Sequence, residues 1–276
     1  MPTQAEKAER FRALHAGAAT FVIPNPWDAG SAKILESLGF AALATTSAGL
    51  AYTLGRNDGQ VSRDEALANA AAICAATALP VSADLENLYA HAPEAAAASI
   101  PLAAATGLVG CSIEDATGDP ANPIYPLDIA VARVKAAVAA ARGLPFPFTL
   151  TARAENFLHG RRDLADTIIR LQAYDAAGAD VLYAPGLSEL SQFEDVVRAV
   201  TKPVNALVPP GLPHLTVADL ARVGVRRISV GAGLARAALG GFLAAAEEIK
   251  TFGTFTYGKI AFPPARLHSI LGKEKS

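Results

Sequence analysis

The sequence is poor in cysteine and in charge. Its 276 residues include two cysteines, 18% charged residues and a formal net charge of −2. Cys74 and Cys111 lack the C-x-x-C or Cys/His spacing of zinc and redox sites, so we expect free, buried thiols. A chain without a basic surplus is not expected to bind nucleic acid or an anionic membrane surface.

Long apolar runs are also missing. The alanine-rich stretch 66–78 falls short of the roughly 20 apolar residues that span a bilayer. The N-terminus, "MPTQAEKAERFRALHAG", has neither the apolar run nor the cleavage site of a signal peptide. We therefore expect a cytoplasmic protein with no membrane partner, and the 51% hydrophobic content predicts a large buried core.

One unit recurs along the chain at roughly 30-residue intervals: a short apolar run, a loop and an alanine-rich helix. The predicted strands are Thr20–Pro24, Ala42–Ser47, Pro80–Glu86, Leu108–Glu114, Phe148–Arg153, Asp180–Ala184, Val204–Leu207 and Arg227–Gly231. The clearest helices are Ala29–Leu38, Arg63–Thr77, Leu127–Arg142, Asp163–Ala177 and Leu234–Lys250. This order predicts an α/β protein with a (β/α)8 TIM barrel, and a doubly wound open sheet is the alternative.

No break in composition divides residues 1–276, which predicts a single barrel domain. Residues 251–276 lie beyond the eighth repeat and contain Phe252, Phe255, Tyr257 and Phe262. Aromatic side chains at this density usually cover another surface. We expect a C-terminal helical extension that packs on the barrel or on a neighbouring subunit.

Polar side chains gather where the predicted strands end, which is the catalytic face of a TIM barrel. Alternation along a strand places the following groups on common faces: Thr45 with Ser47; Ser82 with Asp84 and Glu86; Ser112 with Glu114; Thr149 with Thr151 and Arg153. Burying such groups without partners costs about 1–3 kcal/mol each, so water, a metal or a ligand is expected among them.

Three carboxylates, Asp84, Glu86 and Glu114, are expected to meet from adjacent strands. Clustered carboxylates favour a hard divalent cation, and Mg²⁺ commonly takes few protein ligands together with oxygens of the substrate. Arg153 offers a planar fork for a carboxylate or phosphonate. Alternatively, Arg153 forms an internal salt bridge with Glu114 or Glu155.

Motifs along nearly the whole chain resemble the isocitrate lyase and phosphoenolpyruvate mutase superfamily. They are, in order, "NPWDAGSAKILESLGFAALATTSAG", "RNDGQVSRDE", "SADLEN", "GCSIEDATGD", "TARAENFLHG", "RLQAYDAAGADVLY" and "RRISVGAGLARAA". The resemblance implies a (β/α)8 barrel that holds Mg²⁺ and makes or breaks a C–C or P–C bond next to a pyruvate-like oxo acid.

The resemblance also implies roles for individual residues. Ser47 and the backbone at Ala48 and Gly49 would hold the carboxylate and oxo oxygens of the substrate, and Arg153 would bind a carboxylate. Asp58 would be an essential loop residue near the reacting group. Glu114 would hold Mg²⁺ through water, and Asn205 would line the pocket. Asp58 could instead be an ordinary turn residue of "GRNDG".

Two departures from the family pattern narrow the expected chemistry. The usual Asp-x-Asp motif reads Ser82-x-Asp84, with Glu86 one step further out. The loop "EDATGDPANPIYP" lacks the cysteine of isocitrate and methylisocitrate lyases, so we do not expect that reaction. The mutase branch has a gating loop that contains a lysine and an asparagine. The lysine is missing here, and Asn122 could be a remnant of that loop.

Three functions stay open: a Mg²⁺-dependent lyase or decarboxylase that acts on a small 2-oxo or 2-hydroxy acid through an enolate, a mutase or hydrolase acting on a P–C bond, and a non-catalytic barrel that binds an oxo acid. His91, His159 and His214 lie in loops at the expected mouth and could serve as acid or base or be plain loop residues. The family tends to form tetramers that exchange C-terminal helices, which implies a homo-oligomer, either a dimer or a tetramer.

Overall fold

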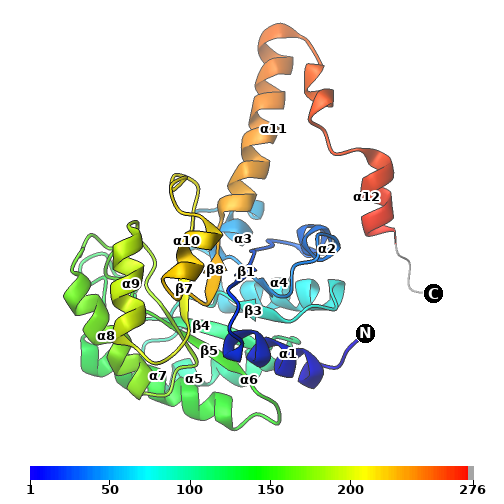
Figure 1. Ribbon diagram of the computed structural model, residues 1–276. Helices are drawn as coiled ribbons and strands as arrows, with labels where there is room; N and C mark the ends of the chain where they lie inside the picture. The colour runs from blue at the N-terminus through cyan, green and yellow to red at the C-terminus, as the bar shows by residue number, and fades with distance from the viewer. Residues whose placement is uncertain (273–276) are drawn as a thin grey trace.

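Eight parallel strands form the centre of the protein (Figure 1) in a computed structural model, which is described here for residues 1–272. They are β1 Phe21–Ile23, β2 Leu43–Ala44, β3 Val81–Ala83, β4 Gly110–Glu114, β5 Thr149–Arg153, β6 Val181–Tyr183, β7 Val204–Leu207 and β8 Arg227–Ser229. Their order in the sheet is β1-β8-β7-β6-β5-β4-β3-β2. The two ends of the sheet meet where Ala44 N donates to Pro24 O at 3.1 Å, just beyond β1. The prediction of a (β/α)8 barrel is confirmed, and the open sheet is wrong.

Helices alternate with the strands around the barrel. They are α1 Gln4–Ala16, α2 Ala29–Ser37, α3 Ser47–Thr53, α4 Arg63–Ala76, α5 Pro93–Ala97, α6 Ser99–Ala105, α7 Leu127–Arg142, α8 Leu164–Ala176, α9 Leu190–Ala199 and α10 Val217–Arg222. Local capping sets several boundaries, as in α4, where the Ser62 side chain accepts from Glu65 N and the Glu65 side chain accepts from Ser62 N. All five predicted helices are observed, and their ends differ from the predicted ends by at most two residues.

Helix α1 covers the amino-terminal end of the barrel. Gln4 Nε2 donates to the carbonyls of Ala104 and Leu108, both at 2.7 Å, and Phe11 is fully buried. A Cβ on Gly110 would lie 3.2 Å from the Phe11 ring and 2.6 Å from a strand carbonyl, so only glycine allows this close approach. Because one end of the barrel is closed in this way, the carboxyl ends of the strands form the open end.

Cys74 and Cys111 are free and buried, as predicted. Within residues 1–272, no helix combines the length and the hydropathy that crossing a membrane requires.

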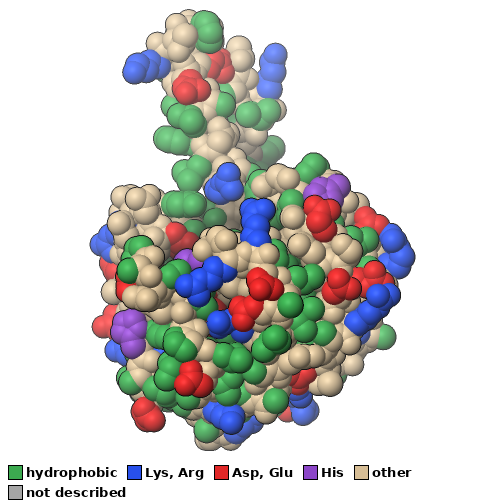
Figure 2. All heavy atoms as spheres, turned by 90° about the vertical axis from the view of Figure 1, so that its left-hand side faces the viewer, with side chains coloured by type: hydrophobic (Ala, Val, Ile, Leu, Met, Phe, Trp, Pro, Cys, Tyr) green, Lys and Arg blue, Asp and Glu red, His purple; other side chains and the backbone are tan. Residues whose placement is uncertain are grey.

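The C-terminal extension is helical, as expected, and leads away from the barrel (Figure 1). It consists of α11 Gly233–Phe252, the 3-10 helix η1 Thr256–Lys259 and α12 Pro264–Leu271. Helix α12 returns toward α2, where Lys33 Nζ donates to Leu271 O at 3.3 Å. Figure 2 shows apolar side chains along the projecting arm. Exposed among them are Leu239, Phe242, Leu243, Ile249, Phe252, Phe255 and Ile260.

Candidate active site

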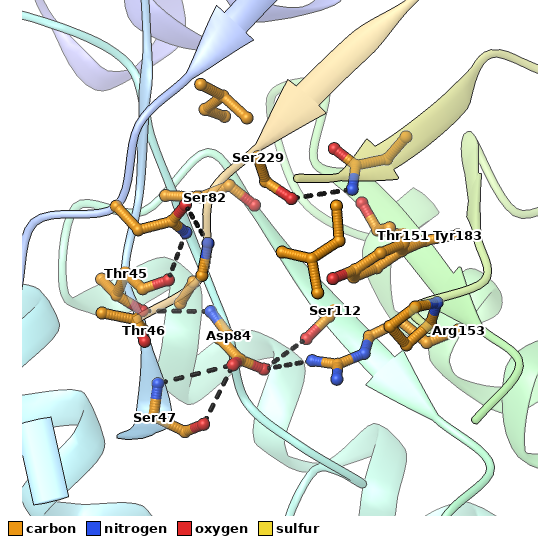
Figure 3. Close-up of a pocket in the computed structure, with 18 of the residues that line it drawn as sticks. Thr45, Thr46, Ser47, Ser82, Asp84, Ser112, Thr151, Arg153, Tyr183 and Ser229 are labelled. Carbon is orange, nitrogen blue, oxygen red and sulfur yellow. Dashed lines mark hydrogen bonds and ion pairs between the residues drawn. The ribbon is translucent and has the colours of Figure 1, made fainter. Parts of the chain in front are cut away.

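A polar cavity of about 200 Å³ lies at the carboxyl ends of the strands (Figure 3). Every strand or the loop that follows it contributes to its lining. The polar side chains in the lining include those of Thr45, Ser47, Asp58, Ser82, Asp84, Ser112, Thr151, Arg153, Asn205, Arg227 and Ser229. The structure therefore brings together most of the polar groups that alternation along the strands had placed on inner faces.

Asp84 is the central acceptor at the mouth of this cavity. Ser47 Oγ donates to its Oδ2 at 3.1 Å, and Ser112 Oγ donates to its Oδ1 at 3.2 Å. Arg153 Nη1 donates to the same Oδ1 at 2.7 Å (Figure 3). The backbone N–H of Asp84 donates to Thr45 Oγ1 at 3.0 Å. Donors from several strands thus fix one carboxylate in place.

Arg153 contacts three carboxylates at once. Its guanidinium lies 2.7 Å from Asp84, 3.1 Å from Glu114 and 2.7 Å from Glu155. Burial raises the pKa of the Glu114 carboxyl well above its usual value, although Arg153 opposes the shift. The alternative expected for Arg153, an internal salt bridge, is therefore observed, and it involves both Glu114 and Glu155.

A second buried network supports this cluster from behind. Asp115 Oδ1 accepts from Glu155 N at 2.8 Å, and Asp115 Oδ2 accepts from Tyr174 Oη at 2.6 Å and from Arg170 Nη1 at 3.0 Å. Asp115 was not among the predicted site residues, because it directly follows Glu114, the last residue of β4, and alternation points it away from the face of Glu114. It fixes the backbone that carries Glu155.

Glu86 does not lie on the inner face predicted for it. Strand β3 ends at Ala83, and Glu86, Leu88 and Tyr89 have φ values of 49°, 60° and 58°. Such left-handed backbone is uncommon for residues other than glycine and ends the alternation of side chains. Glu86 therefore turns out of the cavity lining, and the prediction of a face shared with Ser82 and Asp84 is wrong for Glu86.

An arginine of α7 holds this left-handed segment. Arg133 is fully buried, and its Nη2 donates to Asn87 O and its Nη1 to Ala90 O, both at 2.5 Å, with a further bond to His91 O. Its guanidinium also stacks 4.4 Å from the ring centre of Tyr125. Backbone carbonyls that strand pairing leaves free are satisfied by this one side chain.

Two buried polar atoms near the carboxylates, Glu86 Oε1 and Tyr89 Oη, have no hydrogen-bond partner among residues 1–272. Burial, followed by repulsion from Asp84 and Asp58, raises the pKa of Glu86 to about 7. An unsatisfied carboxylate oxygen among further carboxylates has the donor chemistry that a hard cation such as Mg²⁺ requires.

The expected three-acid ligand group is not assembled, however. The described residues contain no cluster of three or more His, Cys, Asp or Glu side chains arranged to hold a metal ion. The physical reason is that the Arg153 guanidinium lies between Asp84 and Glu114. Of the three expected ligands, only Asp84 lines the cavity, while Glu86 and Glu114 lie outside its lining.

The expected oxo-acid loop begins α3. Ser47 and Ala48 line the cavity, whereas Gly49 does not. The Gly49 N–H donates to Thr46 Oγ1 at 3.2 Å, and a Cβ on Gly49 would lie 2.5 Å from Thr46 Cγ2. Gly49 therefore permits the tight turn that presents Ser47 and Ala48.

Asp58 belongs to the exposed loop after α3, and its side chain contributes to the cavity lining. Desolvation, with repulsion from Asp84, raises the pKa of its carboxyl. Asp58 Oδ1 also accepts from Gly59 N at 3.2 Å, as a turn residue would. Asp58 is therefore both a residue of the turn and part of the cavity lining.

Asn205 lines the cavity floor, within a network inside the barrel. Its Nδ2 donates to Ser229 Oγ at 2.9 Å, and its Oδ1 accepts from Arg227 Nε at 2.8 Å. Sequence reasoning missed Arg227 and Ser229. Alternation in "RRISV" was the signal that could have found them, because it places both on the face that points inward.

The three loop histidines do not line the cavity. His91 Nδ1 contacts Tyr125 Oη at 2.5 Å, His214 Nε2 donates to Ser188 O at 2.9 Å, and His159 is exposed. Asn122 is also outside the lining: its Nδ2 donates to Asp119 Oδ2 at 3.2 Å in an exposed hairpin. Their positions match the reading as ordinary loop residues.

The phosphoenolpyruvate phosphomutase family matches residues 11–250, and the chain belongs to it. This family is part of a superfamily of lyases and mutases that includes isocitrate lyase, so the resemblance seen in the sequence is confirmed. The chain is similar to an uncharacterized protein of Mycobacterium tuberculosis, with 35% identity over 80% of this chain and 81% of the relative. Its identity to an oxaloacetate decarboxylase of Pseudomonas putida is 29%, over 78% and 75% of the two chains.

Solved structures share the fold. A Burkholderia cenocepacia protein described as a candidate lyase/mutase is 55% identical, with a TM-score of 0.94 over 96% of this chain and 95% of its own. A phosphonopyruvate hydrolase, solved with oxalate and Mg²⁺, has a TM-score of 0.85 at 22% identity, over 98% and 95% of the two chains. The protein is thus an enzyme of the superfamily, and the arrangement of its own residues must indicate the reaction.

Proposed function

We propose that this enzyme is a Mg²⁺-dependent lyase that cleaves a C–C bond next to the oxo group of a small 2-oxo or 2-hydroxy acid, by decarboxylation in its simplest form. The observation that carries the proposal is the small cavity in which Arg153 and the hydroxyls of Ser47 and Ser112 surround Asp84. The oxaloacetate decarboxylase among the relatives supports the same bond type.

Arg153 is the group that would bind the substrate carboxylate, by exchanging one of its protein carboxylate partners for the ligand. Ser47 Oγ, once released from Asp84, and the N–H of Ala48 are the donors for the oxo oxygen. Gly49 acts through the turn rather than through its own N–H, which is already used. Asn205 shapes the floor of the pocket. These donors stabilise negative charge that develops on the oxo oxygen as the bond breaks and an enolate forms.

Mg²⁺ binding would require the pairs of Arg153 with Asp84 and Glu114 to open. Asp84, Glu86 and Glu114 are the residues that would then hold the ion, directly or through water. The bound ion would act as an electron sink at the oxo group. Asp58 is the candidate for exchanging a proton with the substrate, since its carboxyl lines the cavity and desolvation raises its pKa.

P–C bond chemistry is the alternative within the family. The hairpin built on the Ala116–Ile124 bridge contains no lysine, and its Asn122 is bonded to Asp119. These features favour C–C cleavage. The third possibility is a barrel that binds an oxo acid without turning it over.

One screen separates the three functions. Oxaloacetate, branched malates, phosphonopyruvate and phosphoenolpyruvate are incubated with the protein and Mg²⁺, and pyruvate release is followed. Release from oxaloacetate or a malate supports the lyase, and release from phosphonopyruvate supports a P–C hydrolase. A mutase interconverts phosphonopyruvate and phosphoenolpyruvate without releasing pyruvate, so this interconversion is followed by 31P NMR. Neither release nor interconversion, together with a higher Tm in oxalate or pyruvate, supports the binding protein.

We further propose that the protein is a homo-oligomer, a dimer or a tetramer, joined through the C-terminal extension. Phe242 and Phe252 on α11 are 72% and 74% exposed, and Phe255 is 70% exposed. Aromatic side chains this open favour burial against a second copy of the chain.

A further inference from the structure

Arg227 is a buried cation on the floor of the same cavity. It is only 6% exposed and lines the cavity together with Arg153. Its Nε donates to Asn205 Oδ1 at 2.8 Å, and its Nη2 donates to Thr151 Oγ1 at 3.0 Å. Both acceptors are neutral.

The third neighbour of Arg227 is neutral as well. His15 Nδ1 donates to Phe11 O at 2.8 Å, so its Nε2 is left to accept from Arg227 Nη1, which lies 3.4 Å away. Burial and the nearby Arg227 lower the pKa of His15 to about 3, so this histidine carries no charge at neutral pH.

The two arginines of the cavity therefore differ in their charge balance. Arg153 is surrounded by three carboxylates, but within residues 1–272 no carboxylate forms an ion pair with Arg227. Burial lowers the pKa of Arg227 to about 10, which still leaves it protonated at neutral pH. A buried charge without a counter-charge is unfavourable by several kcal/mol, so an anion is expected to accompany it.

The walls above Arg227 suit such an anion. Thr151, Ser229 and Ser82 present hydroxyl groups to the cavity, and the two acids of the lining, Asp84 and Asp58, lie at the mouth. Asp84 is already paired with Arg153. The lower half of the cavity thus carries one positive charge and neutral donors.

We propose that Arg227 binds a second carboxylate of the substrate, so that the ligand is a dianionic acid whose far end reaches the cavity floor. The inference rests on the proposed function for the class of ligand, a small 2-oxo or 2-hydroxy acid. It adds that this acid has two carboxylates and that Arg227 selects for the second. The competing explanation is that Arg227 only fixes α1 through His15.

L-malate and L-lactate test the proposal, because the two stable hydroxy acids differ by one carboxylate. Their dissociation constants are measured by calorimetry on the full chain, without metal and again with Mg²⁺. A charge-assisted bond contributes about 1.5–3 kcal/mol, so malate is expected to bind at least about 10-fold more tightly than lactate. Equal binding of the two acids overturns the proposal.

Arg227→Gln is the decisive variant. The preference for malate is expected to fall below about 2-fold while lactate affinity stays unchanged, since only the second carboxylate loses its partner. Arg226→Gln is the matched control, because it removes one charge from the residue just before β8, which does not line the cavity, and it should keep the preference. A preference that survives in Arg227→Gln assigns Arg227 to the support of α1 alone.

If Arg227→Gln does not fold, a crystal structure of the wild-type protein with L-malate decides. A carboxylate within hydrogen-bond distance of the Arg227 guanidinium is expected, and both carboxylates lying away from it contradict the proposal. Failure of the proposed function is seen separately, as an absence of pyruvate release, and does not alter the malate to lactate ratio.

Discussion

Arg153 Nη1 lies 2.7 Å from Asp84 Oδ1, so the principal cation and the principal carboxylate of the cavity bind each other. The same guanidinium also contacts Glu114 and Glu155. A substrate carboxylate and a divalent cation must therefore compete with ion pairs that already exist. Binding is expected to rearrange these pairs while the barrel itself stays unchanged.

Arg153→Gln should lower kcat/KM by about 10- to 100-fold, the equivalent of one charge-assisted bond. It should also lower the free energy of unfolding by about 3–5 kcal/mol, since buried Glu114 and Glu155 lose their counter-charge. Urea denaturation and steady-state kinetics measure both effects. Arg142→Gln, which breaks a more exposed pair with Asp180, is the control and should change stability by at most about 1 kcal/mol. Wild-type activity in Arg153→Gln would remove Arg153 from the site.

Glu86 should make the metal-free protein less stable as the pH rises. Its folded-state pKa of about 7 exceeds the ordinary value of 4.5, so between these values the folded state holds a proton that the unfolded state has released. The free energy of unfolding contributed by Glu86 therefore falls from about pH 4.5 to pH 7. In Glu86→Gln this part of the decline should vanish, as followed by Tm against pH. Glu94→Gln, at an exposed position, should behave like the wild type, and identical profiles for Glu86→Gln and wild type would contradict the assignment.

Mg²⁺ should stabilise the protein more at pH 8 than at pH 6. Carboxylates must be deprotonated to bind a cation, and burial keeps the pKa values of Glu86 and Glu114 high. The Tm increase on adding Mg²⁺, compared at the two pH values, measures the effect. Glu114→Gln should reduce both this increase and turnover, by at least about 10-fold if one charge-assisted contact is lost. Glu9→Gln on the exposed face of α1 is the control, and an unchanged Mg²⁺ response in Glu114→Gln would exclude Glu114 as a ligand.

Arg133→Met should loosen the segment after β3. The substitution leaves the carbonyls of Asn87, Ala90 and His91 without their donor, which we expect to reduce stability by about 2–4 kcal/mol. Hydrogen exchange of residues 86–91 should become faster, and KM should rise more than kcat falls. Unchanged exchange in this segment would show that other contacts hold the left-handed backbone.

Phe242→Asp combined with Phe252→Asp should dissociate the proposed oligomer without unfolding the barrel. Both side chains are exposed on α11, so the substitutions disturb only a surface that a second subunit would cover. Light scattering gives the mass and circular dichroism checks the fold. Leu158→Asp, at an exposed residue outside the arm, is the control. The same mass in the double variant and the wild type would contradict assembly through the extension.

The sequence determined the barrel, because each βα repeat has its own local signals. Helix Leu127–Arg142 is observed with the predicted ends, and strands β4, β5 and β7 end at the predicted residues Glu114, Arg153 and Leu207. The alternation of side chains also indicated correctly that Ser82, Asp84, Ser112 and Arg153 would face one cavity. These features depend on periodicity within single elements, which a sequence displays directly.

Only the tertiary structure decided how the charges are paired. The left-handed segment that follows β3 is bonded to Arg133, which lies more than 40 residues away and donates to the carbonyls of Asn87 and Ala90. The placement of Arg153 among three acids, and of Arg227 among neutral groups, arises from strands that are distant in the chain. The strength of an ion pair and the cost of desolvating it depend on distances in the folded structure. The sequence therefore indicated which groups reach the site, but not which partner each group takes.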